Sequence, residues 1–197
     1  MLQIELSKKY KSGSAAEIIR DAILSGEISG EIAQNEFADS LGVSRIPVRE
    51  ALIILEYSGL IEKFPNQHVK ITDIDSKAIK DIFSDMSLLE LEAIKNLSAE
   101  TLDYLSSIKS QAEFHRELYR NTNSPLRKTF LKIITETYII FVLEHSDNNN
   151  INTVFENLRL SLQDFSMLRA GYAVYAEVLA SELIHIRRRS NINNAQS

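Results

Sequence analysis

The most constraining feature of the sequence is the segment 35–60, in which two helical patterns are separated by a glycine. In the first pattern, apolar residues repeat at helical spacing from Phe37 to Leu41. Gly42 follows directly, and glycine readily adopts the left-handed conformation at which many helices end. The segment therefore predicts a short helix that ends in a tight turn.

The second pattern begins at Ser44, a residue type that often caps the first turn of a helix. Pro47 falls in that first turn, where its missing amide proton costs little. From Val48 on, apolar residues occupy one helical face, whereas Arg45 and Arg49 lie four residues apart on another face. Two short helices joined by a glycine turn are typical of the helix-turn-helix, whose second helix enters the major groove of DNA.

The flanking segments extend this element into a larger domain. An amphipathic helix is predicted at 14–25, and two short strands are predicted at 60–64 and 68–72. Three helices followed by a β-hairpin indicate a winged helix domain over 14–74, in which the hairpin tip is the wing. We expect the lysine-bearing segment 1–13 to be a flexible N-terminal arm.

The rest of the chain has helical periodicity and no further strand pattern. Helices are predicted up to about 98, at 99–121, from 123 to a polar break at 147–150, at 152–169 and at 170–189, the last two separated near Gly171. The expected fold is therefore mainly α: an N-terminal winged helix-turn-helix with a short β-hairpin wing, then an all-α helical bundle. The bundle is expected over 75–190 and a disordered tail over 191–197.

Composition narrows the classes of function. The absence of cysteine excludes disulfides and thiolate metal sites. No apolar run reaches the roughly 18 residues that span a bilayer, so we expect a cytoplasmic protein without a membrane partner. The net charge of −5, with an acidic excess also over 1–74, argues against broad phosphate affinity. No paired catalytic carboxylates, phosphate loop or nucleophile–base motif is visible, so we do not expect an enzyme.

The run LGVSRIPVREALIILEYSGL, at 41–60, resembles the DNA-binding domain of the GntR superfamily of bacterial repressors, and the resemblance covers about 15–74. In that family, the start of each helix of the helix-turn-helix and the wing contact the operator. The resemblance therefore implies DNA contacts from eight residues: Asn35, Ser44, Arg45, Ile46, Pro47, Arg49, Gln67 and His68. Wings of the family usually carry a glycine near position 67, and this chain does not.

Three of these residues also have ordinary structural interpretations. Arg49 could pair on the surface with Glu50, Glu56 or Asp39, and Arg45 could likewise form a surface ion pair. Such a pair would contribute only about 0–1 kcal/mol. His68 could equally be a solvated residue of the hairpin loop. These interpretations stay open at the level of sequence.

A second run, AEFHRELYRNTNSPLRKTF at 112–130, resembles the helical FCD-type C-terminal domain of the FadR subfamily. Such domains dimerise and hold a small-molecule pocket, often with a divalent metal. The metal-binding members have an aspartate and two further histidines at the positions of Gln111, Ser161 and Leu183, so that only His115 remains of the ligand set. We therefore expect no metal and no other cofactor, because a zinc-type site needs three or four converging donors.

The same resemblance implies an effector pocket near Gln111, His115 and Ser161. His115 has an alternative role as a core histidine that is hydrogen-bonded to Gln111, Ser161 or a tyrosine. We expect a sequence-specific transcriptional repressor that binds a palindromic double-stranded DNA operator as a homodimer and responds to a small carboxylate-type effector. The alternative is a constitutive regulator whose helical domain only dimerises and binds no effector.

Overall fold

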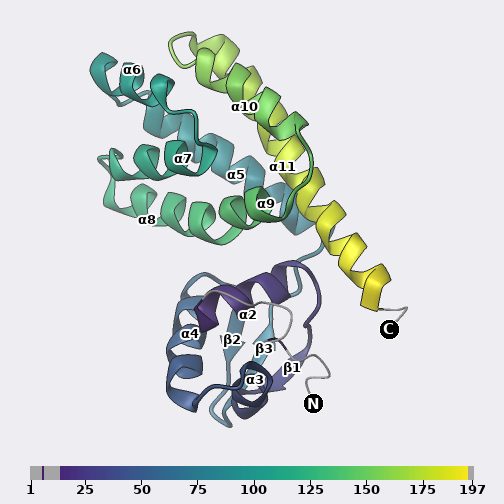
Figure 1. Cartoon of the computed structure of the whole chain (residues 1–197). Helices are drawn as coiled ribbons and strands as arrows, with labels where there is room; N and C mark the ends of the chain where they lie inside the picture. Colours follow the sequence, from purple (N-terminus) through teal and green to yellow (C-terminus); the bar gives the residue numbers. More distant parts are fainter. Residues whose placement is uncertain (1–5, 7–13, 195–197) are drawn as a thin grey trace. The chain divides into compact units, whose positions relative to one another are not determined.

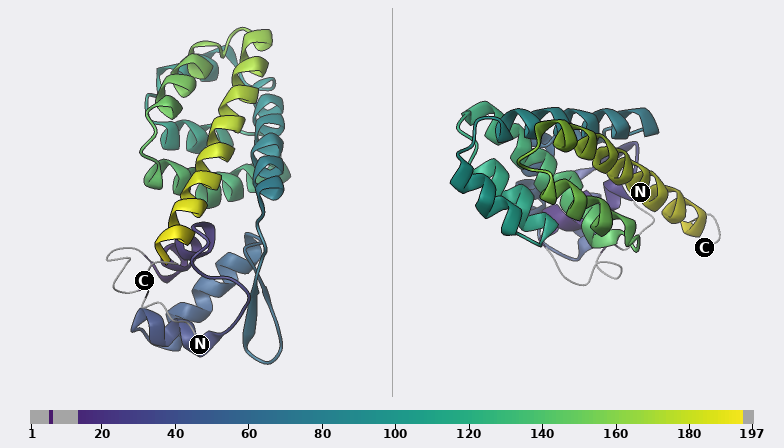
Figure 2. Two further views of the ribbon diagram at one scale, coloured as in Figure 1. Left: turned by 90° about the vertical axis from the view of Figure 1, so that its right-hand side faces the viewer. Right: turned by 90° about the horizontal axis from the view of Figure 1, so that it is seen from above.

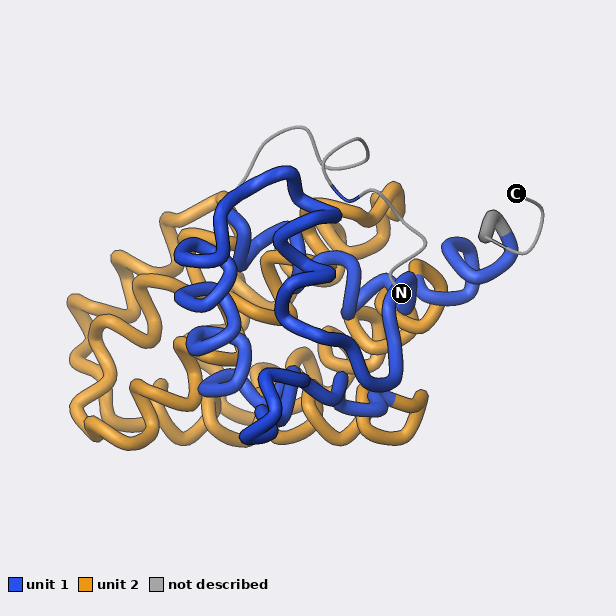
Figure 3. Tube along the Cα trace, turned by 90° about the horizontal axis from the view of Figure 1, so that it is seen from below, with its two compact units in different colours: residues 1–74, 187–197 blue, residues 75–186 orange. Residues whose placement is uncertain are grey.

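A computed structural model of the protein describes Leu6 and residues 14–194. The chain divides into two compact units, which Figure 3 colours separately. Unit 1 comprises Met1–Ile74 with Arg187–Ser197, and unit 2 comprises Asp75–Ile186. Apart from Leu6, the segment predicted as a flexible arm, 1–13, lies outside the described residues. Leu6 itself is buried and its amide donates to Ser40 Oγ (3.0 Å), so at this position the chain is not a solvated arm.

Unit 1 contains the winged helix. Its elements are α2 (Ala15–Leu24), β1 (Glu31–Ala33), α3 (Gln34–Leu41), α4 (Arg45–Tyr57), β2 (Ile61–Lys63) and β3 (His68–Ile71). The three strands form an antiparallel sheet in the order β1-β3-β2. The mainly helical fold class and the winged helix-turn-helix are thereby confirmed, whereas β1 was not predicted. It has only three residues, and its pairing partner β3 lies far away in the sequence, where no local pattern reveals it.

Local chemistry explains the boundaries of the helices in unit 1. Ser14 Oγ accepts from the Glu17 amide and Glu17 accepts from the Ser14 amide, a capping box that starts α2. Gly42 ends α3 with φ 66°, the left-handed conformation that its sequence position predicts. Ser44 is the N-cap residue of α4 by its backbone geometry, although its side chain makes no capping hydrogen bond.

The core of unit 1 collects apolar side chains from all three helices and the sheet. Its buried members include Ile19, Ile23, Phe37, Leu52, Leu55, Leu60 and Val69. One long-range contact adds to it: Arg187 Nη1 donates to the carbonyl oxygens of Ile23 and Leu24, each at 2.9 Å. These carbonyls belong to the last turn of α2, where no amide of the same helix is available to them. Arg187 therefore caps the C-terminus of α2.

Unit 2 is helical throughout its described residues. Its elements are α5 (Ser76–Ile94), α6 (Ala99–Ser107), α7 (Gln111–Arg120), α8 (Pro125–Ile134), a π-helical segment η1 (Thr135–Ile139), α9 (Ile140–His145), α10 (Asn150–Leu160) and α11 (Phe165–Asn194). Figure 1 shows these helices stacked on one another around a shared interior. That interior is filled by buried side chains such as Phe83, Met86, Phe114, Leu118, Phe141, Phe155 and Leu168.

Three predicted boundaries in the helical part were wrong. The helix expected at 99–121 is two helices, because Ser110 caps a new helix by accepting from the Glu113 amide (3.3 Å). The break expected near Gly171 lies instead before Phe165, and α11 runs through the glycine. A Cβ at Gly171 would lie 3.2 Å from Leu158 Cδ1, so the glycine lets α10 and α11 approach closely.

The third boundary concerns the C-terminus. Helix α11 continues to Asn194, four residues into the segment 191–197 that was expected to be disordered, and only 195–197 lie outside the described residues. Asn191 packs beside Gly26 in unit 1, where a Cβ on the glycine would lie 3.4 Å from Asn191 Oδ1. The extra helical turn is thus supported by tertiary contact, which local sequence does not reveal. No helix in the described part of the chain has the length and apolarity that crossing a membrane requires.

Candidate nucleic-acid interface and buried polar cluster

The residues expected to contact DNA gather at one end of unit 1. Figure 1 shows α3, the start of α4 and the β2–β3 turn at this end. A backbone hydrogen bond from the Gln34 amide to the Gln67 carbonyl (3.0 Å) joins the first turn of α3 to the wing turn. Asn35 is the exposed neighbour of Gln34 and therefore lies next to the wing. The fold brings the three predicted segments to one surface.

Arg45 and Arg49 are both exposed on the first two turns of α4, and neither forms an ion pair or side-chain hydrogen bond with any residue that the structure describes. Among the described residues Arg49 pairs with none of Glu50, Glu56 and Asp39, and Glu56 pairs with Lys63 (2.7 Å). Two unpaired guanidinium groups one helical turn apart, on the outer face of a helix, match the arrangement that reads guanines in the major groove.

The three remaining residues at the start of α4 differ in their surroundings. Ser44 is exposed and its hydroxyl has no partner among the described residues, so it is available to a phosphate oxygen. Ile46 is 71% exposed, which is unusual for a large apolar side chain and suits contact with a thymine methyl group. Pro47 is half-buried and fixes the backbone of the first turn.

The wing turn has a distinctive backbone. Gln67 has φ 62°, the one positive φ among the non-glycine residues that the structure describes. A left-handed backbone of this kind is adopted most readily by glycine, the residue type that the resemblance led us to expect near this position. The side chain of Gln67 is exposed, whereas His68 is half-buried with Nδ1 3.4 Å from Glu31 Oε1. His68 is therefore less available to DNA than Gln67.

In unit 2 the residues expected near an effector form a buried polar cluster. His115 Nδ1 lies 2.7 Å from Glu90 Oε1 and its Nε2 lies 3.0 Å from the Tyr175 hydroxyl. Tyr175 donates to Gln111 Oε1 (2.9 Å), and Gln111 Nε2 donates to Asn152 Oδ1 (2.6 Å). Glu90 and His115 are almost completely buried. The chain's own groups therefore satisfy His115 on both sides.

The direction of these bonds fixes where the protons lie. Because the single hydroxyl proton of Tyr175 goes to Gln111, His115 Nε2 must donate to that hydroxyl. Burial raises the pKa of Tyr175 well above its usual value, and the negative charge of Glu90 raises it further. Tyr175 is thus held neutral and keeps its role as donor.

Two polar atoms of this region have no partner among the described residues: Glu90 Oε2 and the Tyr172 hydroxyl, both buried. Burial and the charge of Glu90 raise the pKa of Tyr172 well above its usual value. Ser161, which was expected beside His115, is not part of the cluster, because its hydroxyl donates to the Leu158 carbonyl (2.7 Å). Gln111 and His115 are joined in the cluster and Ser161 is not, and an effector pocket at these residues stays a prediction.

Sequence reasoning missed Glu90, Asn152 and Tyr175 as members of the cluster. A signal for Glu90 was present, since it falls at helical spacing on the buried stripe of α5 that includes Phe83, Met86 and Ile94. A carboxylate on such a stripe needs a buried partner. Tyr175 had no comparable signal, because it is 60 residues from His115 and α11 carries a second tyrosine, Tyr172, one turn away.

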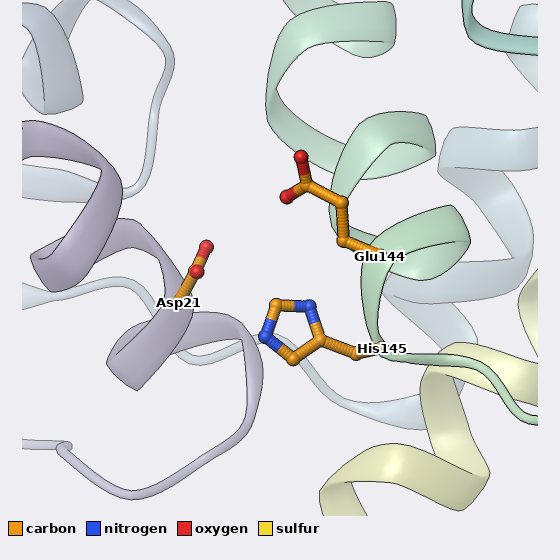
Figure 4. A group of neighbouring side chains, drawn as sticks. All are labelled: Asp21, Glu144 and His145. Atoms are coloured by element: carbon orange, nitrogen blue, oxygen red, sulfur yellow. The ribbon is translucent and has the colours of Figure 1, made fainter. Parts of the chain in front are cut away.

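Three other side chains with metal-binding atoms are shown in Figure 4: Asp21, Glu144 and His145. Asp21 belongs to unit 1, where it pairs with Arg20 (2.7 Å). Glu144 and His145 belong to unit 2, where His145 Nδ1 donates to the Phe141 carbonyl (2.9 Å). Since these residues come from two separate units, we infer no metal site from them.

Comparison with known proteins identifies the N-terminal part. Residues 11–71 match the family described as "Bacterial regulatory proteins, gntR family". This segment is less than half of the chain, and it contains a helix-turn-helix of the GntR type. The matched segment contains the whole of α3 and α4 together with β1, β2 and β3, and therefore also the exposed Arg45 and Arg49.

Two curated relatives carry the same kind of description. The chain is 34% identical over 84 residues to an uncharacterized HTH-type transcriptional regulator in an unstable DNA locus of Streptomyces ambofaciens, a match that covers 42% of this chain and 36% of that protein. It is 24% identical over 128 residues to the uncharacterized HTH-type transcriptional regulator YdhC of Bacillus subtilis (strain 168), covering 64% and 56% respectively. Both relatives are described as transcriptional regulators and not as enzymes.

Solved structures extend the likeness to the fold of the whole chain. McbR/YncC of E. coli has a TM-score of 0.57 at 17% identity, over 87% of this chain and 95% of that one. A second solved structure is described by the statement that Lar controls the expression of the Listeria monocytogenes agr system and mediates virulence. It has a TM-score of 0.58 at 16% identity, over 87% of this chain and 95% of that one. At these identities the likeness concerns the fold alone.

Proposed function

We propose that the protein is a sequence-specific transcriptional repressor of the GntR type that binds a pseudo-palindromic operator as a homodimer. The observation that carries the proposal is the pair of exposed, unpaired guanidinium groups, Arg45 and Arg49, at the start of α4. Arg45, Arg49 and the Ser44 hydroxyl would contact base edges and phosphates in the major groove, while Asn35 and Gln67 would contact the adjoining backbone. Such a protein acts in the cytoplasm, where the DNA is.

Few contacts must supply most of the affinity, because the chain has a net charge of −5. A bidentate contact between arginine and guanine discriminates against the wrong base by about 1–3 kcal/mol. Two such contacts in each half-site, repeated by a two-fold symmetric dimer, are sufficient for a specific operator. The acidic net charge also implies weak binding to random DNA and an affinity for DNA that changes little with salt concentration.

For unit 2 we propose the role of an FCD-type dimerisation and effector domain of the FadR subfamily. The effector would be a small carboxylate that replaces Tyr175 as the partner of His115 Nε2, since this nitrogen donates a hydrogen bond that a carboxylate oxygen accepts well. A carboxylate brings no donor for Glu90 Oε2, so this buried oxygen would stay unsatisfied unless the cluster reorganised. Effector binding would thus require movement of α11.

A second candidate is a constitutive regulator whose unit 2 only dimerises. It is favoured by the hydrogen bonding of His115, whose two ring nitrogens are already bonded to Glu90 and Tyr175. Tyr175 in turn donates to Gln111. In this candidate the network replaces a ligand and keeps the helices of unit 2 in register.

Selection of bound sequences from a random double-stranded DNA pool tests the proposal, with the full chain and with added aliphatic and aromatic carboxylates. We expect enrichment of a pseudo-palindrome whose half-sites are spaced by a whole number of helical turns. Enrichment that changes with one carboxylate supports the effector role, and enrichment that ignores all of them supports the constitutive candidate. Recovery of sequences no different from the starting pool would refute both.

A further inference from the structure

Helix α4 carries a carboxylate, Glu50, on the face that points away from the core of unit 1. The inner side of this helix is marked by its buried residues, Val48, Ala51, Leu52 and Leu55. At 3.6 residues per turn, the direction opposite to their mean lies between Ile46 and Glu50, about 10° from the first and about 30° from the second. Arg45 and Arg49 are exposed as well, but both lie further from this direction. Glu50 therefore points outward more directly than either arginine.

Glu50 is also close to the end of α4 that is proposed to enter the major groove. The left view of Figure 2 shows the helix-turn-helix and the β2–β3 hairpin together at one end of unit 1. Glu50 follows Arg45 by five positions, which is about 7.5 Å along the helix axis. Successive bases of a DNA strand are about 3.4 Å apart, so this distance corresponds to about two base-pair steps. Recognition helices of other DNA-binding motifs contact bases through residues spread over about two turns, and Glu50 falls within that reach.

The Glu50 carboxylate has no partner among the residues that the structure describes, in ion pairs or in hydrogen bonds. Arg49 is the adjacent residue and is unpaired too, but neighbouring residues of a helix do not face each other. The other acidic residue of α4, Glu56, pairs with Lys63 (2.7 Å). Glu50 is thus an exposed negative charge, free to meet a ligand on the face of α4 that is proposed to meet DNA.

A free carboxylate on this face opposes binding to the DNA backbone. It repels phosphates, and the chain already has a net charge of −5. An ionised carboxylate only accepts hydrogen bonds, and the donors in the major groove are the N4 amino group of cytosine and the N6 amino group of adenine. Adenine also presents its N7 acceptor beside the amino group, which repels a carboxylate. Cytosine is therefore the base that compensates best for the repulsion.

We propose that Glu50 is a specificity-determining residue that accepts a hydrogen bond from the N4 amino group of one cytosine in each operator half-site. The same charge weakens binding to sequences without this cytosine, because its repulsion from the phosphates is then not compensated. Glu50 thus both selects the operator and disfavours random DNA. The inference rests on the proposed function, for which it names one base pair of the operator.

The test is the base preference of the full chain and its Glu50 variants, measured by selection from a random DNA pool and then by fluorescence anisotropy. At each position of the selected half-site, the affinity for the selected base pair is divided by the affinity for each alternative. Loss of a negative charge strengthens binding to every sequence alike, and this ratio cancels that effect. Glu50→Ala is expected to lower the ratio by at least about 5-fold at one cytosine, about two base pairs from the position that Arg45 reads. At the other positions the ratio is expected to stay within about twofold.

Glu50→Gln supplies a second readout, which a loss of folding could not imitate. Glutamine pairs with adenine through N6 and N7, so this variant is expected to prefer adenine to cytosine at the same position. The matched control is Glu56→Gln, which removes the same charge from a later turn of α4, where the carboxylate already pairs with Lys63. It is expected to leave the ratio at every position within about twofold.

The outcomes separate this inference from the proposed function. A wild-type protein that selects an operator whose base preferences Glu50→Ala leaves unchanged overturns the inference and leaves the proposed function standing. Uniformly stronger binding by Glu50→Ala, again with unchanged preferences, would assign Glu50 to general repulsion from phosphates and would also overturn the inference. A wild-type protein that selects no sequence refutes the proposed function and the inference with it.

Discussion

Replacing Tyr175 by phenylalanine removes one hydroxyl from the centre of the buried cluster. That hydroxyl accepts from His115 Nε2 and donates to Gln111 Oε1, so its loss leaves one buried donor and one buried acceptor without a partner. Each unsatisfied buried group costs about 1–3 kcal/mol. We therefore expect Tyr175→Phe to lower the free energy of unfolding of unit 2 by about 2–6 kcal/mol.

The matched control is Tyr172→Phe on the same helix. Both tyrosines are 0% exposed, but the Tyr172 hydroxyl has no hydrogen-bond partner among the described residues. Removing it takes away at most one contact with the nearby Glu90 carboxylate, whereas Tyr175→Phe leaves two groups unsatisfied, and we expect a change below about 1 kcal/mol. Urea unfolding followed by far-UV circular dichroism measures both variants. Equal destabilisation by the two substitutions would refute the account, because only the network distinguishes them.

Three further outcomes follow from other parts of the structure. Gln67→Gly should stabilise unit 1 by about 1 kcal/mol in urea unfolding, since a non-glycine residue at φ 62° is strained. The control Asn66→Gly should not stabilise unit 1, because Asn66 Oδ1 accepts a hydrogen bond from the His68 amide. Arg187→Met should lower the stability of unit 1 by about 1–3 kcal/mol through two lost hydrogen bonds to carbonyls of α2, while Arg188→Met at the next, exposed position should have little effect. Burial raises the pKa of Tyr138 to about 12, so the folded state holds the hydroxyl proton more tightly than the unfolded state does. The contribution of this group to stability is complete below pH 10 and should fall between about pH 10 and 12, by up to about 1.4 kcal/mol per pH unit. A free energy of unfolding that does not change over this range would contradict the burial of the hydroxyl.

The helix-turn-helix could be predicted because its determinants are local. Gly42 and Ser44 mark the turn by their own backbone preferences, and the apolar spacing on each side specifies the two helices. The exposed face of α4 follows from the same spacing, so Arg45 and Arg49 were placed correctly on the surface. Their contact with DNA remains a prediction.

The parts that sequence did not reveal depend on distant contacts. Strand β1 exists because it pairs with β3, and α11 extends past Arg187 because that residue caps α2. Gly171 was taken as a helix break, but its lack of a side chain serves packing against Leu158. In each case the determining partner lies too far along the chain for a local pattern to record it.

The polar cluster shows the same division. A carboxylate on the buried stripe of α5 and a histidine on the buried stripe of α7 each signal a polar interior from sequence alone. Their pairing, and the addition of Tyr175 and Asn152, depends on how four helices pack together. Predicting the members of such a cluster therefore requires the fold, whereas predicting that one exists does not.

The central claim, that the start of α4 reads DNA, is tested most directly by fluorescence anisotropy on the selected operator. Arg45→Ala should weaken operator binding by about 1–3 kcal/mol, which is roughly 5- to 150-fold, and should relax the preference at one base pair. Arg188→Ala removes the same charge from another exposed position of unit 1 and should change the affinity less than about twofold. Equal affinities of wild type and Arg45→Ala, with base preference unchanged, would contradict the assignment of α4 as the recognition helix.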